Sequence, residues 1–353
     1  MGGMTTSSPL IRLPGLIDIH VHLRDPGQTH KEDFGSGTAA ALAGGFTRVF
    51  DMPNNATPVT TAAVLDEKMA SARGKIVCDT GFYFGSLGDN LDEFPAIMDR
   101  VSGLKLYLNV TTGGYRIDAD YLERIFKAWG HAKPILLHAE ADVIVTALGV
   151  AKALDQRVHV CHVSNRAELE PILRAKAEGV DVTCGVTPHH LFLNEADARR
   201  LGNYGEVRPA LKPQADVDYL WEHFDEIDVV ESDHAPHTKA EKEAGTFGFP
   251  GLETTLPLML AAERDGRLTR AQLVAKLADG PRRVLGLAEE ADTFVEVEPV
   301  GFEMSAEGMQ SRAAWTPFAG RTGFGRVKRV TLRGAVVYED GVVLAAPGSG
   351  RLV

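Results

Sequence analysis

A pair of histidines inside a short apolar stretch constrains this sequence most. Residues 15–26 read Gly-Leu-Ile-Asp-Ile-His-Val-His-Leu-Arg-Asp-Pro, and their β-branched and apolar residues predict a buried strand over residues 16–22. Alternate side chains of a strand share one face, so His20 and His22 would present their imidazoles side by side. That arrangement fits a metal site, although an isolated His-x-His pair is about as often an ordinary part of a half-buried strand. The rest of the chain decides between these two interpretations.

Strand-like runs alternate with helix-like segments along most of the chain. Seven more apolar runs predict strands over residues 47–52, 76–84, 102–108, 134–139, 157–162, 181–186 and 227–233. Segments rich in alanine, leucine and charged residues lie between most of them and are long enough for crossover helices. Eight strands connected in this way predict an α/β fold, a (β/α)8 barrel of the TIM type. An open, doubly wound sheet is the alternative, but no G-x-G-x-x-G fingerprint follows the first strand.

The pattern changes after residue 290. Residues 293–298 and 327–338 alternate apolar and polar side chains, which is typical of short antiparallel strands, and Asp340-Gly341 predicts a hairpin turn. We therefore expect a barrel domain over residues 13–290. Residues 1–12 and 291–353 would form a small β-rich appendage from the two chain termini.

Composition and charge argue against several classes of function. The formal net charge is -11 and no run of lysine and arginine is present, which disfavours nucleic acid and anionic membranes as partners. No apolar stretch approaches the roughly 20 residues of a membrane span. Residues 1–9 lack the pattern of a signal peptide. Three cysteines cannot form a disulfide framework, so we expect a cytoplasmic protein.

Side chains that can bind metals stand at the ends of five of the predicted strands. In barrels of this kind the active groups collect at the C-terminal ends of the strands. The residues in question are His20 and His22, Lys105, His138, His162 and Asp233. Four neutral imidazoles and a carboxylate suit Zn(II) or a similar divalent ion. They are too many for one tetrahedral catalytic site with an open position, so they indicate two metals.

Lys105 needs a different chemistry from the other residues of this set. An ammonium group has no lone pair to give to a metal ion. A neutral amine that has taken up CO2 becomes a carbamate, which is anionic and can bridge two cations. A lone lysine at a strand end more often extends its charged group to solvent. The carbamate is therefore favoured only because the other five candidate metal ligands are predicted at the ends of neighbouring strands.

Short motifs follow one another from about residue 13 to the C-terminal tail. They are His20-Val-His22-Leu-Arg24-Asp-Pro-Gly, Asp51-Met-Pro-Asn54, Gly103-Leu-Lys105-Leu-Tyr, His138-Ala-Glu, Cys161-His162-Val, Thr187-Pro-His-His190-Leu, Gly205-Glu-Val-Arg208-Pro, Ser232-Asp233-His-Ala-Pro-His237 and Gly248-Phe-Pro-Gly-Leu-Glu253-Thr. Together they resemble the dihydroorotases of the cyclic-amidohydrolase superfamily, and most closely the dihydroorotase domain of the animal multifunctional pyrimidine-synthesis proteins. So many motifs in the expected order make the resemblance very specific.

The resemblance implies two Zn(II) or similar divalent ions in each chain. Their ligands would be His20, His22 and Asp233 for the first ion, His138 and His162 for the second, and carboxylated Lys105 as the bridge between them. A hydroxide held between the ions would attack the ring amide carbonyl, with Asp233 as general acid and base. The reaction implied is the reversible cyclisation of N-carbamoyl-L-aspartate to (S)-dihydroorotate and water, a step of pyrimidine biosynthesis.

The same resemblance implies which residues hold the substrate. Arg24, Asn54 and His237 would bind its carboxylate, for which a guanidinium is well suited. Arg208 and the backbone at Phe247-Gly248 would line the ring side. A loop with Thr111 and Thr112 would close over the substrate, although Thr112 stands where the animal domain has an aromatic residue.

Some expectations depart from the animal domain or stay open. Gly185 stands where that domain has a glutamate that helps to hold a third zinc with a cysteine matching Cys161, so we expect no third metal. A homodimer and a complex with aspartate transcarbamoylase are candidate assemblies. A hydantoinase, dihydropyrimidinase or allantoinase is the main alternative, since these enzymes share the metal set. An inactive homologue that serves as a scaffold for a transcarbamoylase is a weaker one, because all six ligand residues are present.

Overall fold

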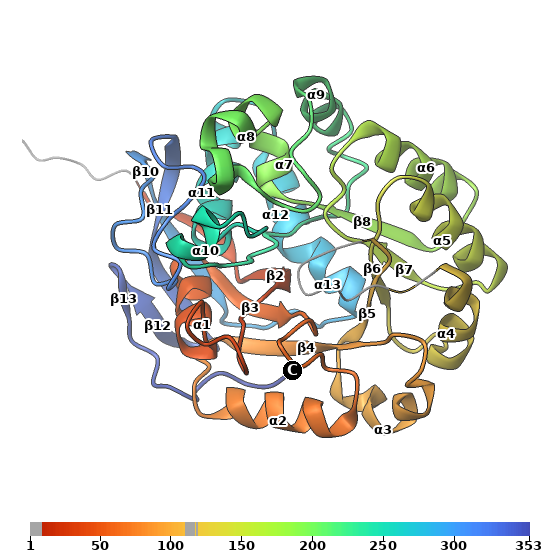
Figure 1. The fold of residues 1–353 in the computed structure, drawn as a ribbon. Coiled ribbons are helices and arrows are strands. Elements are labelled where there is room, and N and C mark those ends of the chain that lie inside the picture. Colours follow the sequence, from red (N-terminus) through yellow and green to blue (C-terminus); the bar gives the residue numbers. More distant parts are fainter. Residues whose placement is uncertain (1–8, 110–116, 118) are drawn as a thin grey trace, which may run out of the picture.

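Eight parallel strands form the centre of the fold, as the sequence predicts. The computed structural model describes residues 9–109, 117 and 119–353, and in this part of the chain the parallel sheet has the order β2-β3-β4-β5-β6-β7-β8-β9 (Figure 1). Its strands are β2 (Leu16–Val21), β3 (Phe46–Asp51), β4 (Asp79–Gly85), β5 (Gly103–Tyr107), β6 (Ile135–His138), β7 (Val158–Val160), β8 (Val182–Val186) and β9 (Val229–Val230). The expected barrel is therefore confirmed.

The first and last strands meet and close the barrel. Val21 forms a parallel bridge with His234, and the backbone N–H of His22 donates to the carbonyl of His234 over 2.8 Å. This contact brings the C-terminal end of β2 beside the segment that follows β9. Residues that are more than 200 positions apart in the sequence therefore share one rim.

Helices cover the outside of the barrel. In Figure 1, α2 to α6 surround the strands from β4 to β8. The helices are α1 (Phe34–Ala43), α2 (Ala62–Arg73), α3 (Phe94–Ile97), α4 (Leu122–Trp129), α5 (Asp142–Ala153), α6 (Arg166–Ala177), α7 (Pro188–Phe192), α8 (Glu195–Leu201), α9 (Gln214–Glu222), α10 (Lys239–Glu243), α11 (Leu252–Arg264), α12 (Arg270–Val274) and α13 (Gly280–Leu285). Short 3-10 turns lie at Leu91–Glu93, Met98–Arg100, Ala119–Tyr121 and Gly202–Gly205, and a π-helical turn lies at Ala275–Asp279.

Capping residues set where several helices begin. Helix α1 begins at Phe34, because the carboxylate of Asp33 accepts the N–H of Ser36 over 2.8 Å and so caps the first turn. Thr61 and Asn165 cap α2 and α6 in the same way.

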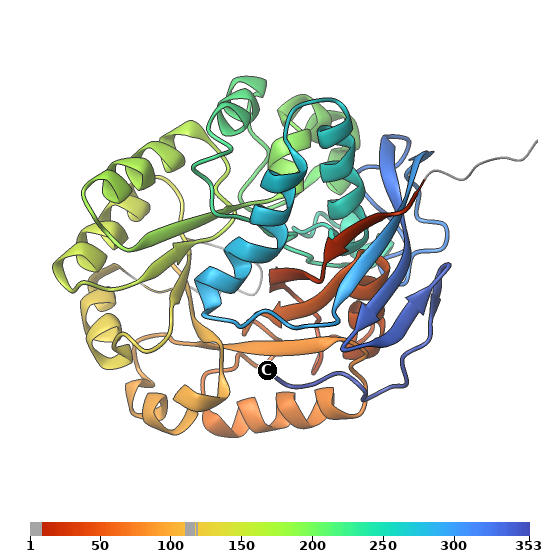
Figure 2. The same ribbon diagram turned by 180° about the vertical axis from the view of Figure 1, so that it is seen from behind.

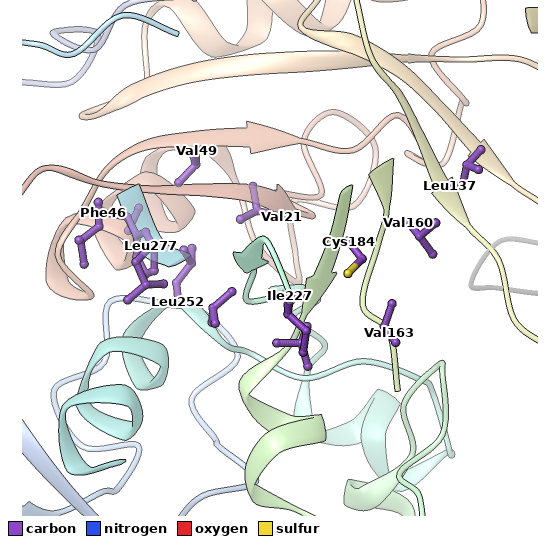
Figure 3. Close-up of a cluster of buried hydrophobic side chains, with 14 of the residues drawn as sticks. Val21, Phe46, Val49, Leu137, Val160, Val163, Cys184, Ile227, Leu252 and Leu277 are labelled. Atoms are coloured by element: carbon purple, nitrogen blue, oxygen red, sulfur yellow. The ribbon is translucent and has the colours of Figure 1, made fainter. Parts of the chain in front are cut away.

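The main apolar core lies between the strands and the surrounding helices. Val21, Val49 and Val160 on the strands are buried together with Leu252 and Leu277 on helical segments (Figure 3). Burial of this kind is the dominant favourable contribution to folding. Because the packed helices hold the outer faces of the strands, the polar ends of the strands keep fixed positions at the rim.

A second, antiparallel sheet lies against one side of the barrel. Its strands, in spatial order, are β1 (Ile11–Pro14), β10 (Phe294–Glu303), β11 (Thr322–Leu332), β12 (Ala335–Glu339) and β13 (Val342–Val343) (Figure 2). The predicted hairpin turn at Asp340-Gly341 joins β12 to β13. The tail then returns to the barrel, where the N–H of Thr80 donates to the carbonyl of Arg351 over 2.8 Å. The division of the chain at residues 13 and 290 stays a prediction.

Among the described residues, no helix combines the length and the apolar character that a membrane crossing requires.

Candidate metal centre and substrate pocket

His20, His22 and Asp233 come together where the barrel closes. His20 lies on β2 and His22 directly follows it, so both imidazoles point to the same side. The Oδ1 atom of Asp233 lies 3.4 Å from Nε2 of His20 and 3.1 Å from Nε2 of His22. All three side chains are buried, and burial raises the pKa of Asp233 to about 6. Two imidazole nitrogens and a carboxylate oxygen thus face one point.

His138 and His162 form a second pair at the ends of β6 and β7. Nδ1 of His138 lies 2.9 Å from Nε2 of His162, and the ring of His162 lies 5.1 Å from that of His20 between centroids. Burial lowers the pKa of each imidazole well below the usual value for histidine. Both side chains are therefore neutral, which is the form that binds metals. The structure therefore brings all four predicted histidines into one cluster.

Lys105 lies beneath these histidines on β5. Its side chain has no solvent exposure, and its Nζ donates to Sγ of Cys161 over 3.1 Å. Nζ also lies 5.0 Å from the centre of the Tyr107 ring. A thiol and an aromatic ring are poor partners for a buried ammonium ion, because desolvation of a charge is costly without strong compensation. These surroundings suit an amine that reacts and then carries a different group.

Asn54 contacts a histidine of the cluster rather than standing free for a ligand. Its Oδ1 lies 2.8 Å from Nδ1 of His22. An amide oxygen accepts, so Nδ1 of His22 carries the proton and Nε2 keeps its lone pair for a metal. Asn54 also lines the pocket, where its amide nitrogen remains for a substrate.

Asp18 is a buried acidic residue that hydrogen-bonds to the backbone beside the cluster. Asp18 accepts the backbone N–H groups of His20 and Ser232 over 3.0 and 3.2 Å, so it joins β2 to the end of β9. Burial raises the pKa of Asp18 to about 7. Asp18 therefore fixes the backbone that carries the candidate ligand His20.

Glu231 is the residue of this site that sequence reasoning missed. It is fully buried, it accepts the backbone N–H of His162 over 2.5 Å, and its Oε2 lies 3.4 Å from Nδ1 of His20. Burial opposes its ionisation, but the neighbouring His20 and His159 outweigh burial and hold the pKa of this carboxyl below its usual range. Its spacing of two residues from Asp233, the same spacing as His20 and His22, was the available signal.

Three residues at this rim have a left-handed backbone conformation. Arg24, His162 and Asp233 have φ values of 64°, 39° and 44°, which are uncommon for residues other than glycine. Such conformations persist where the surrounding structure holds them, and they are frequent at functional sites.

A pocket opens directly over the cluster. It encloses about 370 Å³, part of it open to solvent. Its walls are His20, His22, Arg24, Asn54, Tyr107, His138, His162, Arg208, Asp233, Ala235, Phe247 and Gly248. All of the metal-binding candidates except Lys105 therefore line it, together with most of the residues expected to hold the substrate.

Arg24 and Arg208 place two guanidinium groups in the pocket wall. Arg24 is 4% exposed, and its Nη2 lies 3.1 Å from Nε2 of His237. His237 does not line the pocket, so it contacts the guanidinium on the side away from the pocket. The guanidinium of Arg208 lies 3.9 Å above the centre of the Phe247 ring. Gly248 has a φ of 131°, and a Cβ there would lie 2.7 Å from the carbonyl oxygen of Ala235, so only glycine fits. Thr111 and Thr112, the predicted lid residues, lie outside the described residues.

The donors fit divalent metal ions. Nδ1 of His138 and Nε2 of His162 face each other over 2.9 Å, so one ion could bind both nitrogens. His20, His22 and Asp233 also offer one ligand atom each, and these atoms lie within 4.8 Å of one another. A barrel with such a cluster at the C-terminal ends of its strands defines the class of metal-dependent amidohydrolases.

Comparison with known proteins places the chain within this class. The sequence profile of the amidohydrolase family matches residues 11–180. The multifunctional protein CAD of Squalus acanthias is 47% identical over 98% of the chain, which spans 16% of that much longer protein. The dihydroorotase of Pyrococcus abyssi is 36% identical over 97% of the chain and 87% of its own length. The solved L-hydantoinase of Arthrobacter aurescens superposes with a TM-score of 0.92 at 28% identity, over 97% of this chain and 88% of that one. The chain belongs to the dihydroorotase family.

Proposed function

We propose that this hydrolase interconverts N-carbamoyl-L-aspartate and (S)-dihydroorotate with two divalent ions, zinc being the best match to the donors. The observation that carries the proposal is the convergence of the two histidine pairs and Asp233 in one pocket whose wall holds a buried arginine, with Lys105 buried outside the pocket lining. His20, His22 and Asp233 would hold one ion, and His138 and His162 the other. Lys105, as a carbamate formed with CO2, would bridge them.

Bound at this site, the ions would lower the pKa of water and polarise the carbonyl of the ring amide. Asp233 supplies the proton transfers. In ring opening, its carboxylate takes a proton as the water oxygen bonds to the carbonyl carbon. The C–N bond then breaks and Asp233 returns the proton to the leaving nitrogen. Cyclisation is the same sequence in reverse, with water as the product.

Arg24 would select the substrate. Its guanidinium offers parallel N–H donors that match a carboxylate. The hydrogen bond with His237 and the one from its Nε to the carbonyl of Pro236, over 3.2 Å, hold the group in one orientation. Asn54 would contact the same carboxylate through its amide nitrogen. The ring would then lie against Phe247 and Gly248, beside Arg208.

Hydantoinase activity is the second candidate function, because the chain superposes closely on a solved L-hydantoinase. The buried Arg24 favours a substrate that carries a carboxylate. The deciding experiment compares kcat/KM of the metal-loaded protein for dihydroorotate, hydantoin and allantoin. We expect dihydroorotate to be preferred by at least ~10²-fold, the scale on which a site loses binding when a buried charged partner is left unpaired. Faster opening of hydantoin or allantoin would contradict the proposal.

The proposal also covers the assembly and the location of the protein. A homodimer and association with an aspartate transcarbamoylase are the proposed assemblies, since the chain spans a small part of a multifunctional relative. We also propose a cytoplasmic location, which the three free, buried cysteines support.

A further inference from the structure

The short segment that carries Arg208 is held at both of its ends by side chains that the proposed reaction does not use. Arg208 lies in the pocket wall, with its guanidinium over the ring of Phe247. Two residues before Arg208, the carbonyl of Glu206 accepts two hydrogen bonds, and one residue after it the carbonyl of Pro209 accepts another. Two of the three donors are buried side chains on the short helices α10 and α7.

Lys242 of α10 is the first of these side chains. It has no solvent exposure, and its Nζ donates to the carbonyl of Glu206 over 2.8 Å and to that of Thr246 over 2.6 Å. The backbone N–H of Gly248 donates to the same Glu206 carbonyl over 3.1 Å. Lys242 therefore joins the segment before Arg208 to the segment around Gly248, and both segments line the pocket.

Lys242 is a costly residue for the interior of the protein. Among the described residues its amino group forms no ion pair, and Nζ lies 5.4 and 5.3 Å from the centres of the Phe249 and Trp315 rings. Burial lowers its pKa to about 8. Desolvation of an amino group costs free energy that an apolar side chain of similar size would avoid. What the amino group adds is the pair of hydrogen bonds that fixes two segments of the pocket.

His190 of α7 holds the other end of the segment. Its Nε2 lies 3.1 Å from the carbonyl oxygen of Pro209, and its Nδ1 lies 2.8 Å from Oγ1 of Thr187. A carbonyl only accepts, so Nε2 carries the proton and Nδ1 accepts from the hydroxyl group. Burial lowers the pKa of His190 to about 3, which keeps the ring neutral. The motif Thr187-Pro-His-His190, which the metal centre does not use, thus acts on the residue after Arg208.

We propose that Lys242 and His190 are positioning residues for Arg208. The inference rests on the proposed function, in which Arg208 lies beside the ring of the substrate. Neither side chain lines the pocket, so both act through the main-chain carbonyls of residues 206 and 209. The ion pair of Arg208 with Glu206 is long, at 3.7 Å, and the arginine side chain is 34% exposed. A fixed backbone on both sides reduces the freedom that Arg208 loses when the substrate binds.

Lys242→Met tests the proposal, because methionine fills a similar volume but cannot donate a hydrogen bond. We expect KM for dihydroorotate to rise about 10-fold, the scale of one lost hydrogen bond, with kcat and the metal content of the chain unchanged. Lys276→Met is the matched control. Lys276 is also buried and donates to two main-chain carbonyls, those of Asp225 and Ile227, but these residues precede β9 and do not line the pocket. This variant should keep the wild-type KM.

A double-mutant cycle separates positioning from a general loss of structure. Arg208→Ala removes the group that Lys242 is proposed to hold, so Lys242→Met should raise KM no further in that background, whereas independent effects would multiply. His190→Leu should behave in the same way as Lys242→Met. His190→Gln can place an amide nitrogen where Nε2 stands, so it should keep most of the wild-type affinity. Should Lys242→Met fail to fold, the two His190 variants and their combinations with Arg208→Ala provide the same test.

Two results would overturn the positioning role and leave the proposed function intact. One is an unchanged KM in Lys242→Met and His190→Leu. The other is a rise of KM that is as large in the Arg208→Ala background as in the wild type. A metal-loaded wild type that does not open dihydroorotate would instead overturn the proposed function, and this inference with it.

Discussion

Oδ1 of Asp233 lies 3.1 Å from Nε2 of His22, although 211 residues separate the two in the sequence. Closure of the barrel between β2 and the segment after β9 produces this contact. The same closure places the carboxylate beside His20, so one side chain lies next to two candidate metal ligands and at the floor of the pocket. Asp233 is thus in position to bind a metal and to move a proton.

Asp233→Asn should retain metal and lose most of the activity. The amide keeps an oxygen for the first ion, but it cannot take and return a proton. We expect kcat to fall by on the order of 10²-fold or more, the usual contribution of a general acid or base. Steady-state kinetics and elemental analysis of the same preparation provide the check. Near-normal turnover would remove Asp233 from the proton transfer.

Lys105→Ala should abolish metal binding at both positions of the centre. Without a bridging carbamate the two ions lose a shared anionic ligand, and activity falls with them. Short carboxylic acids in the buffer should restore part of the activity, because a carboxylate can occupy the space of the carbamate. Metal content measured after native purification decides the matter. An unchanged metal content would show that Lys105 is not a bridge.

Asn54→Ala should weaken metal binding. The substitution removes the acceptor of the His22 Nδ1 proton, which lies 2.8 Å away, and loss of such a partner typically lowers metal affinity by roughly 10- to 100-fold. Competition with a chelator measures the change. Asn54→Asp keeps an acceptor and is the matched control. A raised KM with unaltered metal affinity would limit Asn54 to substrate binding.

The strands and the metal-binding candidates could be predicted from the sequence because each depends on local pattern. Apolar runs mark buried strands, and in a parallel barrel the end of every such run reaches the same rim. The contacts between side chains from different strands could not be predicted from such patterns. Glu231 has a local signal in its spacing of two residues from Asp233, but its partners, His20, His159 and His162, come from other strands and could not be predicted from that spacing.

The role of Asn54 shows the same limit. Motif resemblance implies a contact with the substrate carboxylate, whereas the structure adds a hydrogen bond to His22. That bond depends on how the loop after β3 folds over the end of β2. Likewise, sequence alone does not show that His237 holds Arg24 from outside the pocket wall.

Glu253 should make the stability of the fold depend on pH. This residue of α11 accepts the N–H groups of Gln310 and Ser311 and so joins the barrel to the segment between β10 and β11. Burial raises its pKa to about 7, whereas the unfolded chain should titrate near the usual value of about 4.3. The folded state therefore binds more protons than the unfolded state between these values. Its contribution to stability is fully present below about pH 4.3 and is lost as pH rises through 7.

Glu253→Gln should remove this loss, because the amide resembles the protonated acid and does not ionise. The melting temperature of the variant relative to the wild type should rise by a few degrees between pH 5 and pH 8, equivalent to roughly 2 kcal/mol. Glu298→Gln, at an exposed position on β10, controls for the loss of a negative charge. A difference in melting temperature between the variant and the wild type that does not change with pH would show that Glu253 titrates normally.

Arg24→Lys should impair binding of the substrate carboxylate more than the chemistry. Lysine keeps the positive charge, but it cannot offer two parallel N–H donors, and it would lose the fixed orientation that His237 and Pro236 give to the guanidinium. We expect kcat/KM for dihydroorotate to fall by about 10²-fold, mainly through KM, as expected when a charged hydrogen-bonded pair worth about 3 kcal/mol is lost. Hydantoin has no carboxylate for Arg24 to hold, so any slow opening of hydantoin should be nearly unchanged in the variant. An equal loss on both substrates would mean that Arg24 supports the metal centre or the fold rather than the choice of substrate.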